Sequence, residues 1–512
     1  MLIVNLAVVV SVALLLVNVF LAYNFGATLN DYLVGVGFET NPNETQEFLY
    51  TYFDVWLILC FLAILGLLFF GYRGGEFIAK ALVAQDYKNL KDSKKSFRGG
   101  DRVIWVIFIA LLTILIIIHI FRLRPVDERQ SDVLYNATTS IHSAFKKVRE
   151  QIRQFENLNT DFEGYAKDIT FSPIQSSNKI DTIALVIGES QQRNLMQIYG
   201  YYLPNTPNLV SLRQKSPQNL LIFTDIISSQ ATTSESLSQA LTFANQDNLH
   251  TAWHTHLNII DLAKLAGYKT FGISNQERYS VWAKASTSIF NRNDEVHWLS
   301  FSTSFDGSKP DGNILPILDK VLQNNQKQST FITLHLMGNH STYYKRYPKA
   351  FDNFKAKDIQ SQRGAKVIAE YANATAYNDF VLSEIFKRFK EGDSIVFYFS
   401  DHGEDVFDTL TGGHNDITIN RFMLEIPFII YVSDTFIQKH PHTYARLKAA
   451  QNTAFMNDDF IHALIDIMGF EIDGFKPHRS LFSNNFTPRK RMVGTKANKD
   501  YDIELKHQER LP

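Results

Sequence analysis

The sequence of 512 residues contains a single cysteine, Cys60, and its formal net charge at pH 7 is only -1. One thiol has no partner within the chain, so the fold must be stable without a disulfide framework. A chain without an excess of Lys and Arg has little means of neutralising nucleic-acid phosphates, which argues against nucleic acid as a partner. Hydrophobic residues make up 45% of the chain, which is enough for a large core, and the length suggests more than one domain.

Charged residues are also scarce in three long apolar runs, at residues 2–23, 55–72 and 103–123. Each run has about the ~20 residues that a helix needs to cross the ~30 Å hydrocarbon core of a bilayer. These runs predict three membrane-spanning helices within a transmembrane region of residues 1–124. A cleaved signal peptide in place of the first helix is disfavoured, because no Lys or Arg precedes the run and no clear small-residue cleavage site follows it.

Basic residues are distributed unevenly between the two loops that join these runs. Residues 24–54 contain no Lys or Arg, whereas residues 73–102 contain eight. Because Lys and Arg favour the cytoplasmic side of a membrane, the second loop is predicted to be cytoplasmic. The chain after the third helix is therefore predicted to lie on the other side, as an extracytoplasmic domain anchored to the membrane.

The remainder of the chain shows two patterns. Residues 125–178 are polar with helical spacing and predict a helical connector. From 179 to 512, helix-like stretches such as 259–266 and 371–389 alternate with short β-rich runs. The β-rich runs lie at 182–187, 270–273, 330–334, 394–399 and 427–432. Strands that alternate with helices predict an α/β domain with a mostly parallel central sheet flanked by helices on both faces.

Three of the β-rich runs are followed by residue types that bind metals. Glu189 follows the first, His335 and His340 follow the third, and Asp401 and His402 follow the fourth. Singly, each has an ordinary structural explanation, since a Glu stabilises a helix start and a lone His is usually a satisfied structural residue. Together they are expected to converge, because ligands of open α/β sheets bind beyond the carboxyl ends of the strands. Carboxylate oxygen and imidazole nitrogen are ligands that Zn²⁺ accepts.

A nucleophile is predicted at Thr232 or Thr233, directly before a helix-like stretch. A hydroxyl at this position is also a common helix cap. Coordination to a metal would lower the pKa of the hydroxyl, as zinc lowers that of water from about 15.7 to roughly 7, so that it attacks phosphorus. The positive end of the helix dipole would help to hold the phosphoryl oxygens. The residues thus point to metal-dependent phosphoryl transfer.

Six motifs resemble, in matching order, those of the bacterial phosphoethanolamine transferases, which belong to the alkaline phosphatase and sulfatase superfamily. The resemblance covers residues from about 179 to 483 and agrees with the predicted membrane topology. It implies a sulfatase-like domain. The motifs are Gly188-Glu-Ser, Thr233 before a helix, Leu334-His-Leu-Met-Gly-Asn-His340, Tyr343-Tyr-Lys-Arg-Tyr-Pro348, Ser400-Asp-His-Gly-Glu404 and Gly413-His414.

The resemblance implies a ligand set and a nucleophile. Glu189, Thr233, Asp401 and His402 would surround one catalytic zinc ion, and Thr233 would be the nucleophile. The stretch Leu237–Asn245 is most similar to members that modify the lipopolysaccharide core, and alignment on it selects Thr233 over its neighbour.

Further residues would act on the substrate. His340 and His414 would bind the substrate phosphate or a second zinc ion, and one of them would transfer a proton. His335 matches a family histidine of less specific role. Asn275, in a Ser-Asn-Gln segment, is a further substrate-binding candidate.

The implied reaction has two steps. Thr233 attacks the phosphodiester of phosphatidylethanolamine and releases diacylglycerol, leaving a covalent phosphothreonine intermediate. Lipopolysaccharide then accepts the phosphoethanolamine group, with a core heptose favoured over lipid A. We expect a monomer, in contact with membrane lipid, that spans the inner membrane several times and has its catalytic domain in the periplasm.

Alternatives are a phosphoglycerol transferase of the same superfamily and a non-enzymatic membrane-anchored binding protein on an inactive sulfatase-like fold. A sulfatase is disfavoured because the chain has no Cys/Ser-x-Pro-x-Arg segment. The chain departs from the family in two respects. Members usually carry five spanning helices and often several disulfides, whereas this sequence predicts three helices and no disulfide. With no Lys or Arg before the first helix, a start farther upstream stays open.

Overall fold

The computed structural model describes residues 179–511 apart from nine short gaps, together with residues 171–172 and parts of 12–21 and 55–66. The gaps are 250–251, 256, 278–284, 301–308, 326, 362, 411, 416–417 and 496–497, each left out of the description that follows. The chain divides into two compact units, one of Met1–Gly37 with Glu44–Lys146, the other of Phe38–Asn43 with Lys147–Pro512.

The residues described within 12–21 and 55–66 are helical. None of the helices in the described part of the chain has the length and apolar character needed to cross a bilayer. Outside the described residues lie most of the predicted span 2–23, half of 55–72, all of 103–123 and most of the connector 125–178. These assignments stay predictions.

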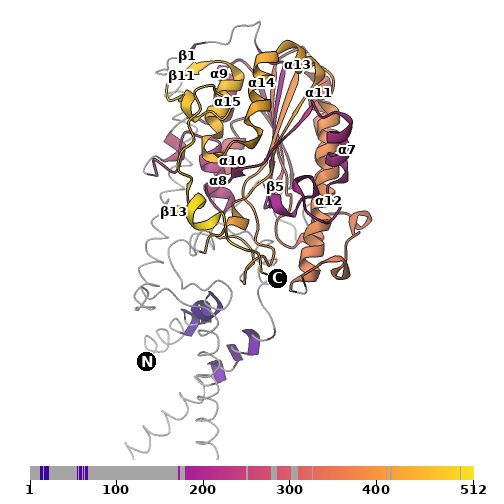
Figure 1. The fold of residues 1–512 in the computed structure, drawn as a ribbon, viewed down its shortest axis with the longest axis vertical. Helices are drawn as coiled ribbons and strands as arrows, with labels where there is room; N and C mark the ends of the chain where they lie inside the picture. The colour runs from indigo at the N-terminus through magenta and orange to yellow at the C-terminus, as the bar shows by residue number, and fades with distance from the viewer. Residues whose placement is uncertain are drawn as a thin grey trace, which may run out of the picture. The chain divides into compact units, whose positions relative to one another are not determined.

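A seven-stranded sheet in the order β3-β9-β8-β2-β7-β5-β6 forms the centre of the second unit (Figure 1). Only β9 runs against the others, since it pairs antiparallel with both neighbours while the remaining pairs are parallel. The prediction of a mostly parallel sheet is confirmed. The strands are β2 (Thr182–Gly188), β3 (Leu220–Phe223), β5 (Lys269–Glu277), β6 (Glu295–Ser300), β7 (Thr330–His335), β8 (Ser394–Ser400) and β9 (Phe428–Val432).

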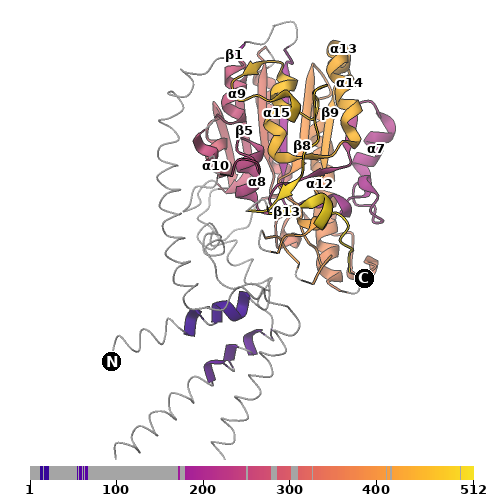
Figure 2. The same cartoon turned by 60° about the vertical axis from the view of Figure 1, so that its left-hand side comes forward.

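Helices cover both faces of this sheet, as Figure 2 shows. Apolar side chains of α8, α9, α10, α13, α14 and α15 join the core on one face, and those of α7, α11 and α12 join the core on the other. The helices are α7 (Pro207–Lys215), α8 (Thr233–Ala240), α9 (Ile259–Leu265), α10 (Ala285–Phe290), α11 (Leu315–Asn324), α12 (Ala365–Arg388), α13 (Asp434–Lys439), α14 (Pro441–Ala449) and α15 (Phe460–Met468).

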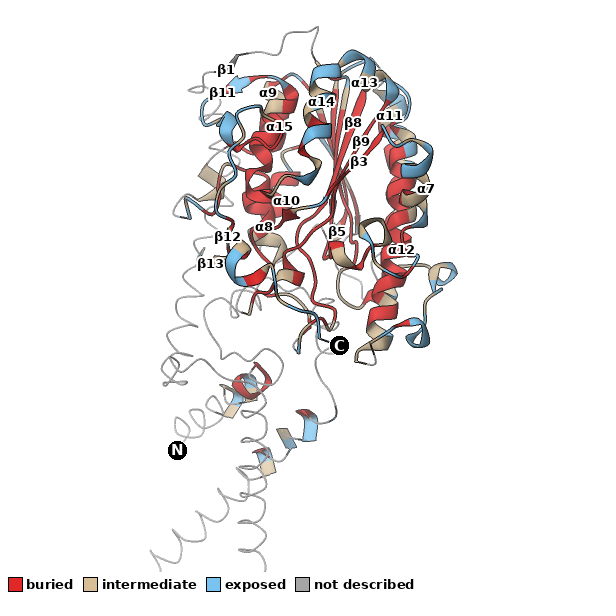
Figure 3. Ribbon diagram, in the orientation of Figure 1, coloured by how far each residue is buried: buried red, intermediate tan, exposed pale blue. Residues whose placement is uncertain are grey.

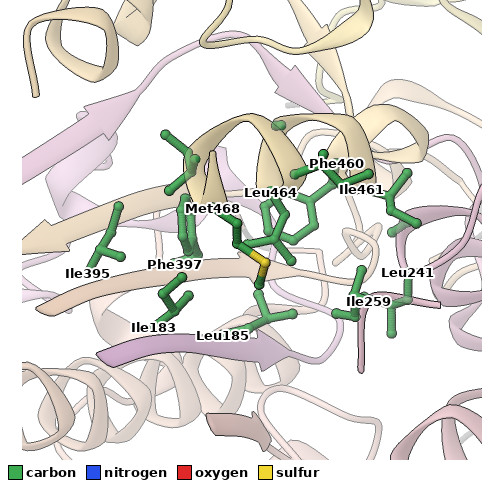
Figure 4. Packing of buried hydrophobic residues seen from close by; sticks show 14 of the residues in the cluster. Ile183, Leu185, Leu241, Ile259, Ile395, Phe397, Phe460, Ile461, Leu464 and Met468 are labelled. Atoms are coloured by element: carbon green, nitrogen blue, oxygen red, sulfur yellow. The ribbon is translucent and has the colours of Figure 1, made fainter. Parts of the chain in front are cut away.

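The central strands are apolar throughout because both of their faces are covered. In β2, Ile183 and Leu185 point to one core and Ala184 and Val186 to the other, as the alternation of side chains along a strand requires. The buried residues appear red through the sheet in Figure 3. In Figure 4, Ile183 and Leu185 lie among side chains from β8 and α15.

Short paired strands complete the unit as three two-stranded sheets, β1 with β11, β4 with β10, and β12 with β13. They are β1 (Phe171–Ser172), β4 (Ile226–Ile227), β10 (Phe455–Met456), β11 (Glu471–Ile472), β12 (Met492–Val493) and β13 (Lys499–Asp500).

Candidate active site

Parallel pairing brings the carboxyl ends of three strands together. In the central sheet Ile187 of β2 lies opposite His335 of β7, and Gly188 lies opposite Ser400 of β8. The residues that follow these strands therefore leave the sheet side by side. Glu189 and Asp401 are the first residues beyond β2 and β8, and both are buried.

Four side chains meet at this edge. Thr233 Oγ1, at the start of α8, lies 3.2 Å from Glu189 Oε1 and 3.4 Å from His402 Nε2. The same nitrogen lies 3.4 Å from Glu189 Oε1 and 3.4 Å from Asp401 Oδ2. The sequence-predicted ligand set thus comes together, although its members are far apart in the chain.

The cluster fits a tetrahedral zinc ion. Ligand atoms about 2.0–2.1 Å from a tetrahedral centre lie about 3.3–3.4 Å from one another, which is close to the separations seen here. Asp401 Oδ2 is buried and has no hydrogen-bond partner among the described residues. His402 Nδ1 donates to the Gly403 carbonyl at 2.7 Å, so the lone pair of the neutral ring is on Nε2, facing the cluster.

Two buried carboxylates and one imidazole control one another's protonation. Burial raises the pKa of Asp401, and the charge of Glu189 raises it further, to about 7. Burial lowers the pKa of His402, but the charge of Asp401 and the hydrogen bond with Glu189 outweigh it and raise the pKa to about 10. Burial also opposes ionisation of Glu189, yet His402 holds its pKa well below the usual range. The cluster therefore favours a positive charge at its centre, which a divalent cation would supply.

Helix α8 is tied to the end of β8 by buried polar groups. Ser236 Oγ donates to the Asp401 carbonyl at 2.5 Å, and Asn457 Nδ2 donates to Ser236 Oγ at 3.0 Å. The Thr232 hydroxyl donates to Glu235 at 2.6 Å, whereas the Thr233 hydroxyl is turned to the cluster. The two adjacent threonines thus have different surroundings.

A second group of ionisable side chains lies beside the cluster. His414 Nδ1 is 2.6 Å from Glu404 Oε2, and the His414 ring is 4.2 Å from the ring of His402. Tyr343 donates to Glu404 Oε1 at 2.8 Å. His402, Glu404 and His414 have atoms placed to hold a metal. Glu404 was not predicted as a site residue from the sequence. Its position at the end of the Ser400–Glu404 motif is the feature that could have identified it.

His335, the last residue of β7, and His340, in the loop that follows, also belong to this edge. The charges of His340 and His335 both act to lower the pKa of Glu189, after the larger effect of His402. His335 is buried and its ring centre is 5.5 Å from that of Phe290. Their substrate-binding roles stay predictions.

The Ser-Asn-Gln segment at the end of β5 presents Gln276, rather than Asn275, to the cluster. Asn275 is buried and donates to Asp311 Oδ1 and to a backbone carbonyl, both at 2.7 Å. Gln276 Nε2 lies 3.4 Å from Glu189 Oε2 and donates to the Leu336 carbonyl at 2.9 Å. The substrate role of Asn275 stays a prediction, and Gln276 is a site residue that the sequence reading did not select.

A mostly parallel sheet with an acidic and histidine cluster and a helix-borne threonine at its carboxyl edge defines an enzyme domain of the alkaline phosphatase and sulfatase type. A sequence model of the family described as Sulfatase matches residues 181–470. The phosphoethanolamine transferase EptC of Escherichia coli is 29% identical over 501 residues, which are 93% of this chain and 82% of that protein. The phosphoethanolamine transferase CptA of Salmonella typhimurium is 28% identical over 498 residues, with the same coverage.

Two solved structures of phosphoethanolamine transferases are similar to this chain. The C-terminal periplasmic domain of EptC from Escherichia coli, in complex with Zn, has 32% identity and a TM-score of 0.60, covering 66% of this chain and 96% of that one. The integral membrane protein EptA from Neisseria meningitidis has a TM-score of 0.60 over 92% of this chain and 86% of that one, at 16% identity, which shows a shared fold. The chain therefore belongs to the sulfatase family and, within it, to the phosphoethanolamine transferases, as its motifs predicted.

Proposed function

We propose that this enzyme is zinc-dependent and transfers phosphoethanolamine from phosphatidylethanolamine to lipopolysaccharide, with a core heptose favoured over lipid A. The observation that carries the proposal is the set of Glu189, Thr233, Asp401 and His402, whose facing atoms are 3.2–3.4 Å apart in the pairs that define it. The names of its relatives support the transferred group, and the zinc complex of the similar periplasmic domain supports the metal.

The proposed setting is the inner membrane. Residues 1–124 would anchor the chain with three helices, 125–178 would form a connector, and 179–512 would form the catalytic domain in the periplasm. Apolar composition and the bias of basic residues between the loops support this arrangement. The periplasmic domain named in the structure of the similar EptC is consistent with it.

Zinc bound to the four-residue set would lower the pKa of the Thr233 hydroxyl and offset the negative charge of the phosphate. We propose one ion at this set, and the His402, Glu404 and His414 group is the place for a second. The buried carboxylates and the Nε2 atom of His402 are held in place by the protein before any ligand arrives, which limits reorganisation during the reaction.

In the first step Thr233 Oγ1 attacks the phosphorus of phosphatidylethanolamine. The bond from phosphorus to the diacylglycerol oxygen breaks, and phosphoethanolamine remains as an ester on Thr233. The proton of the Thr233 hydroxyl passes through the site to the departing diacylglycerol oxygen. His414 suits this transfer, because Glu404 holds its Nδ1 at 2.6 Å and leaves Nε2 to exchange the proton.

In the second step a hydroxyl or phosphate oxygen of the acceptor attacks the same phosphorus. His414 or His340 takes the proton when the acceptor is a hydroxyl, and Thr233 leaves with its oxygen reprotonated. His414 can therefore serve proton transfer in both steps, releasing a proton in the first and taking one up in the second, as microscopic reversibility requires.

The test uses full-length protein in detergent with phosphatidylethanolamine and no acceptor. We expect one burst of diacylglycerol per active site and a phosphoethanolamine adduct on the peptide that contains Thr233, with Thr233→Ala abolishing both. When phosphatidylglycerol replaces phosphatidylethanolamine as the donor lipid, a diacylglycerol burst with a glycerophosphate adduct on the same peptide would favour the phosphoglycerol transferase instead. An active protein in which Thr233→Ala keeps full transfer would show that the nucleophile is another residue.

A further inference from the structure

The segment between β7 and α12 carries an unusual concentration of positive charge. Residues 341–361, called here the basic segment, contain five Lys and Arg and two Asp, in a chain whose net charge is -1. The segment forms three short 3-10 turns, η7 (Tyr343–Lys345), η8 (Lys349–Phe351) and η9 (Ala356–Asp358), that pack along α12. Of its motif Tyr343 to Pro348, only Tyr343 contacts a residue of the proposed chemistry, through its hydrogen bond to Glu404.

Two lysines of the basic segment have ammonium groups that are not paired with an acidic side chain in the described part of the chain. Lys349 and Lys357 are exposed and make no ion pair with any residue in the described part of the chain, whereas Lys355 pairs with Asp352 at 2.5 Å. Tyr344, in η7 of the same segment, is 54% exposed, a large fraction for an aromatic ring. Figure 3 shows pale blue, exposed turns beside the first half of α12.

The basic segment begins at the active site. It follows His340 directly, and its Tyr343 donates to Glu404 Oε1 at 2.8 Å, so it contacts the residue that holds His414. Its other end is tied to neighbouring surface, because the Gln360 amide donates to the Tyr202 hydroxyl at 3.0 Å.

Exposed apolar side chains border the same surface. Tyr202 is 43% exposed and Leu410, in the loop between Glu404 and His414, is 56% exposed. Arg363, just beyond the segment, donates to the Leu410 carbonyl at 2.6 Å and thereby joins that loop to the start of α12. Hydrogen bonds therefore join the basic segment to Tyr202, and the start of α12 to the loop between Glu404 and His414.

We propose that the basic segment, with Tyr202, Tyr344 and Leu410, is the surface that binds the acceptor, a phosphorylated saccharide of lipopolysaccharide. The inference rests on the proposed function. The ammonium groups of Lys349 and Lys357 would pair with phosphates of the acceptor, and the tyrosine rings offer flat apolar faces to its sugars.

Charge distinguishes the acceptor from the donor. Phosphatidylethanolamine has one phosphate, which is consumed at Thr233, and its headgroup has no net charge, so cations outside the site gain little from it. Lipopolysaccharide carries several phosphates spread over its sugars, and these remain when one hydroxyl is held at the reacting phosphorus. Unpaired lysines on a segment that begins at the site match that second pattern.

The experiment compares charge variants of the full-length protein in detergent. Lys349→Glu with Lys357→Glu reverses the two unpaired charges, and Tyr344→Ser removes the exposed ring. The matched control is Lys320→Glu with Lys327→Glu, since these lysines are also exposed but lie in and just after α11, on the path into the amino end of β7. Two quantities are measured for each variant: the diacylglycerol burst without acceptor and the apparent KM for purified lipopolysaccharide.

We expect the charge reversal to raise the apparent KM for lipopolysaccharide on the order of tenfold, or roughly 1.4 kcal/mol, with the burst equal to that of the control. Tyr344→Ser should raise it by a smaller factor. Lipopolysaccharide stripped of its phosphates should show a raised KM with wild-type protein and little further change in the charge variant.

Other results would overturn the proposal. An unchanged KM in the charge variant removes the surface from acceptor binding, and an equal loss of the burst assigns it to the donor or to anionic lipid. Failure of the proposed function has a different signature, because wild-type protein would then show no burst and no adduct on Thr233.

Discussion

Gly338 lies against the backbone of Glu189 with no room for a side chain. A Cβ atom on Gly338 would be 2.7 Å from both the amide nitrogen and the carbonyl oxygen of Glu189, and the residue has a φ of +53°. The next residue, Asn339, donates its backbone amide to the Glu189 carbonyl at 2.9 Å. The loop after β7 thus presses on the backbone that carries a proposed zinc ligand, and only glycine permits that approach.

Gly338→Ala should therefore displace Glu189. We expect more than tenfold loss of transfer and weaker zinc binding, because the added methyl group must push on backbone atoms rather than on a flexible side chain. Gly392→Ala is the matched control. Gly392 also has positive φ, +80°, but a Cβ there would meet nothing within 4 Å. Kinetics and bound zinc are compared in the two variants; equal losses would mean that backbone strain, and not the contact with Glu189, is responsible.

Glu404→Gln should slow the reaction while leaving the fold intact. The amide keeps the shape of the carboxylate but no longer provides the charge that orients and supports a protonated His414 at 2.6 Å. We expect kcat to fall on the order of 10²-fold and the pH profile of kcat to change shape. Tyr343→Phe removes only the hydroxyl that donates to Glu404 at 2.8 Å, and should have a smaller effect. A Glu404→Gln enzyme with wild-type kcat and profile would exclude Glu404 from proton transfer.

Tyr371 supports the turn that follows Glu189. Its buried hydroxyl donates to the Ser190 carbonyl at 2.7 Å and accepts from the Gln192 amide at 2.7 Å. Ser190 itself has a positive φ of 55°. Tyr371→Phe leaves both backbone groups buried without this partner, so we expect a loss of about 1–3 kcal/mol in stability and lower activity.

The control for this change lies on the same helix. Tyr377→Phe removes a hydroxyl that accepts one hydrogen bond, from the Gly312 amide at 3.0 Å. Thermal unfolding and zinc content are measured for both variants. We expect the larger loss of zinc in Tyr371→Phe, and the reverse order would argue against this role for the turn.

The domain should lose stability in acid through His462. Burial lowers the pKa of this side chain and the charge of Arg479 lowers it further, to about 3, while its Nδ1 accepts from the Lys476 amide at 3.3 Å. The unfolded chain binds a proton at this histidine below its ordinary pKa of about 6.5, but the folded chain does so only near 3. The stabilisation is therefore complete above about pH 6.5 and declines as the pH falls toward 3.

His462→Gln should flatten this dependence by one proton, about 1.4 kcal/mol per pH unit between pH 6 and 4. Thermal unfolding of the full-length protein across that range gives the slope. His442→Gln, at an exposed position on α14, is the control and should leave the slope unchanged. A His462→Gln variant with the wild-type slope would assign the acid sensitivity to other groups.

The residue predicted from the sequence and the residue found near the site differ most clearly at the end of β5. Sequence similarity selected Asn275, yet Gln276 approaches Glu189 at 3.4 Å. The pairing of β5 with β6 is irregular between Ser274 and Glu277. A shift of one residue in a strand reverses which side chains face the site, and nothing local in the sequence reveals such a shift.

The amino-acid sequence alone determined the class of the protein and most of its proposed ligand set. Apolar runs without polar alternation predict a sheet covered on both faces, and in such a sheet the residues just after parallel strands, Glu189 and Asp401, must share one edge. Tertiary structure decided the contacts whose partners are distant in the chain: Thr233 turned to the cluster, Gly338 against Glu189, and Tyr343 joining the basic segment to Glu404. These depend on packing between whole elements, which local residue patterns do not encode.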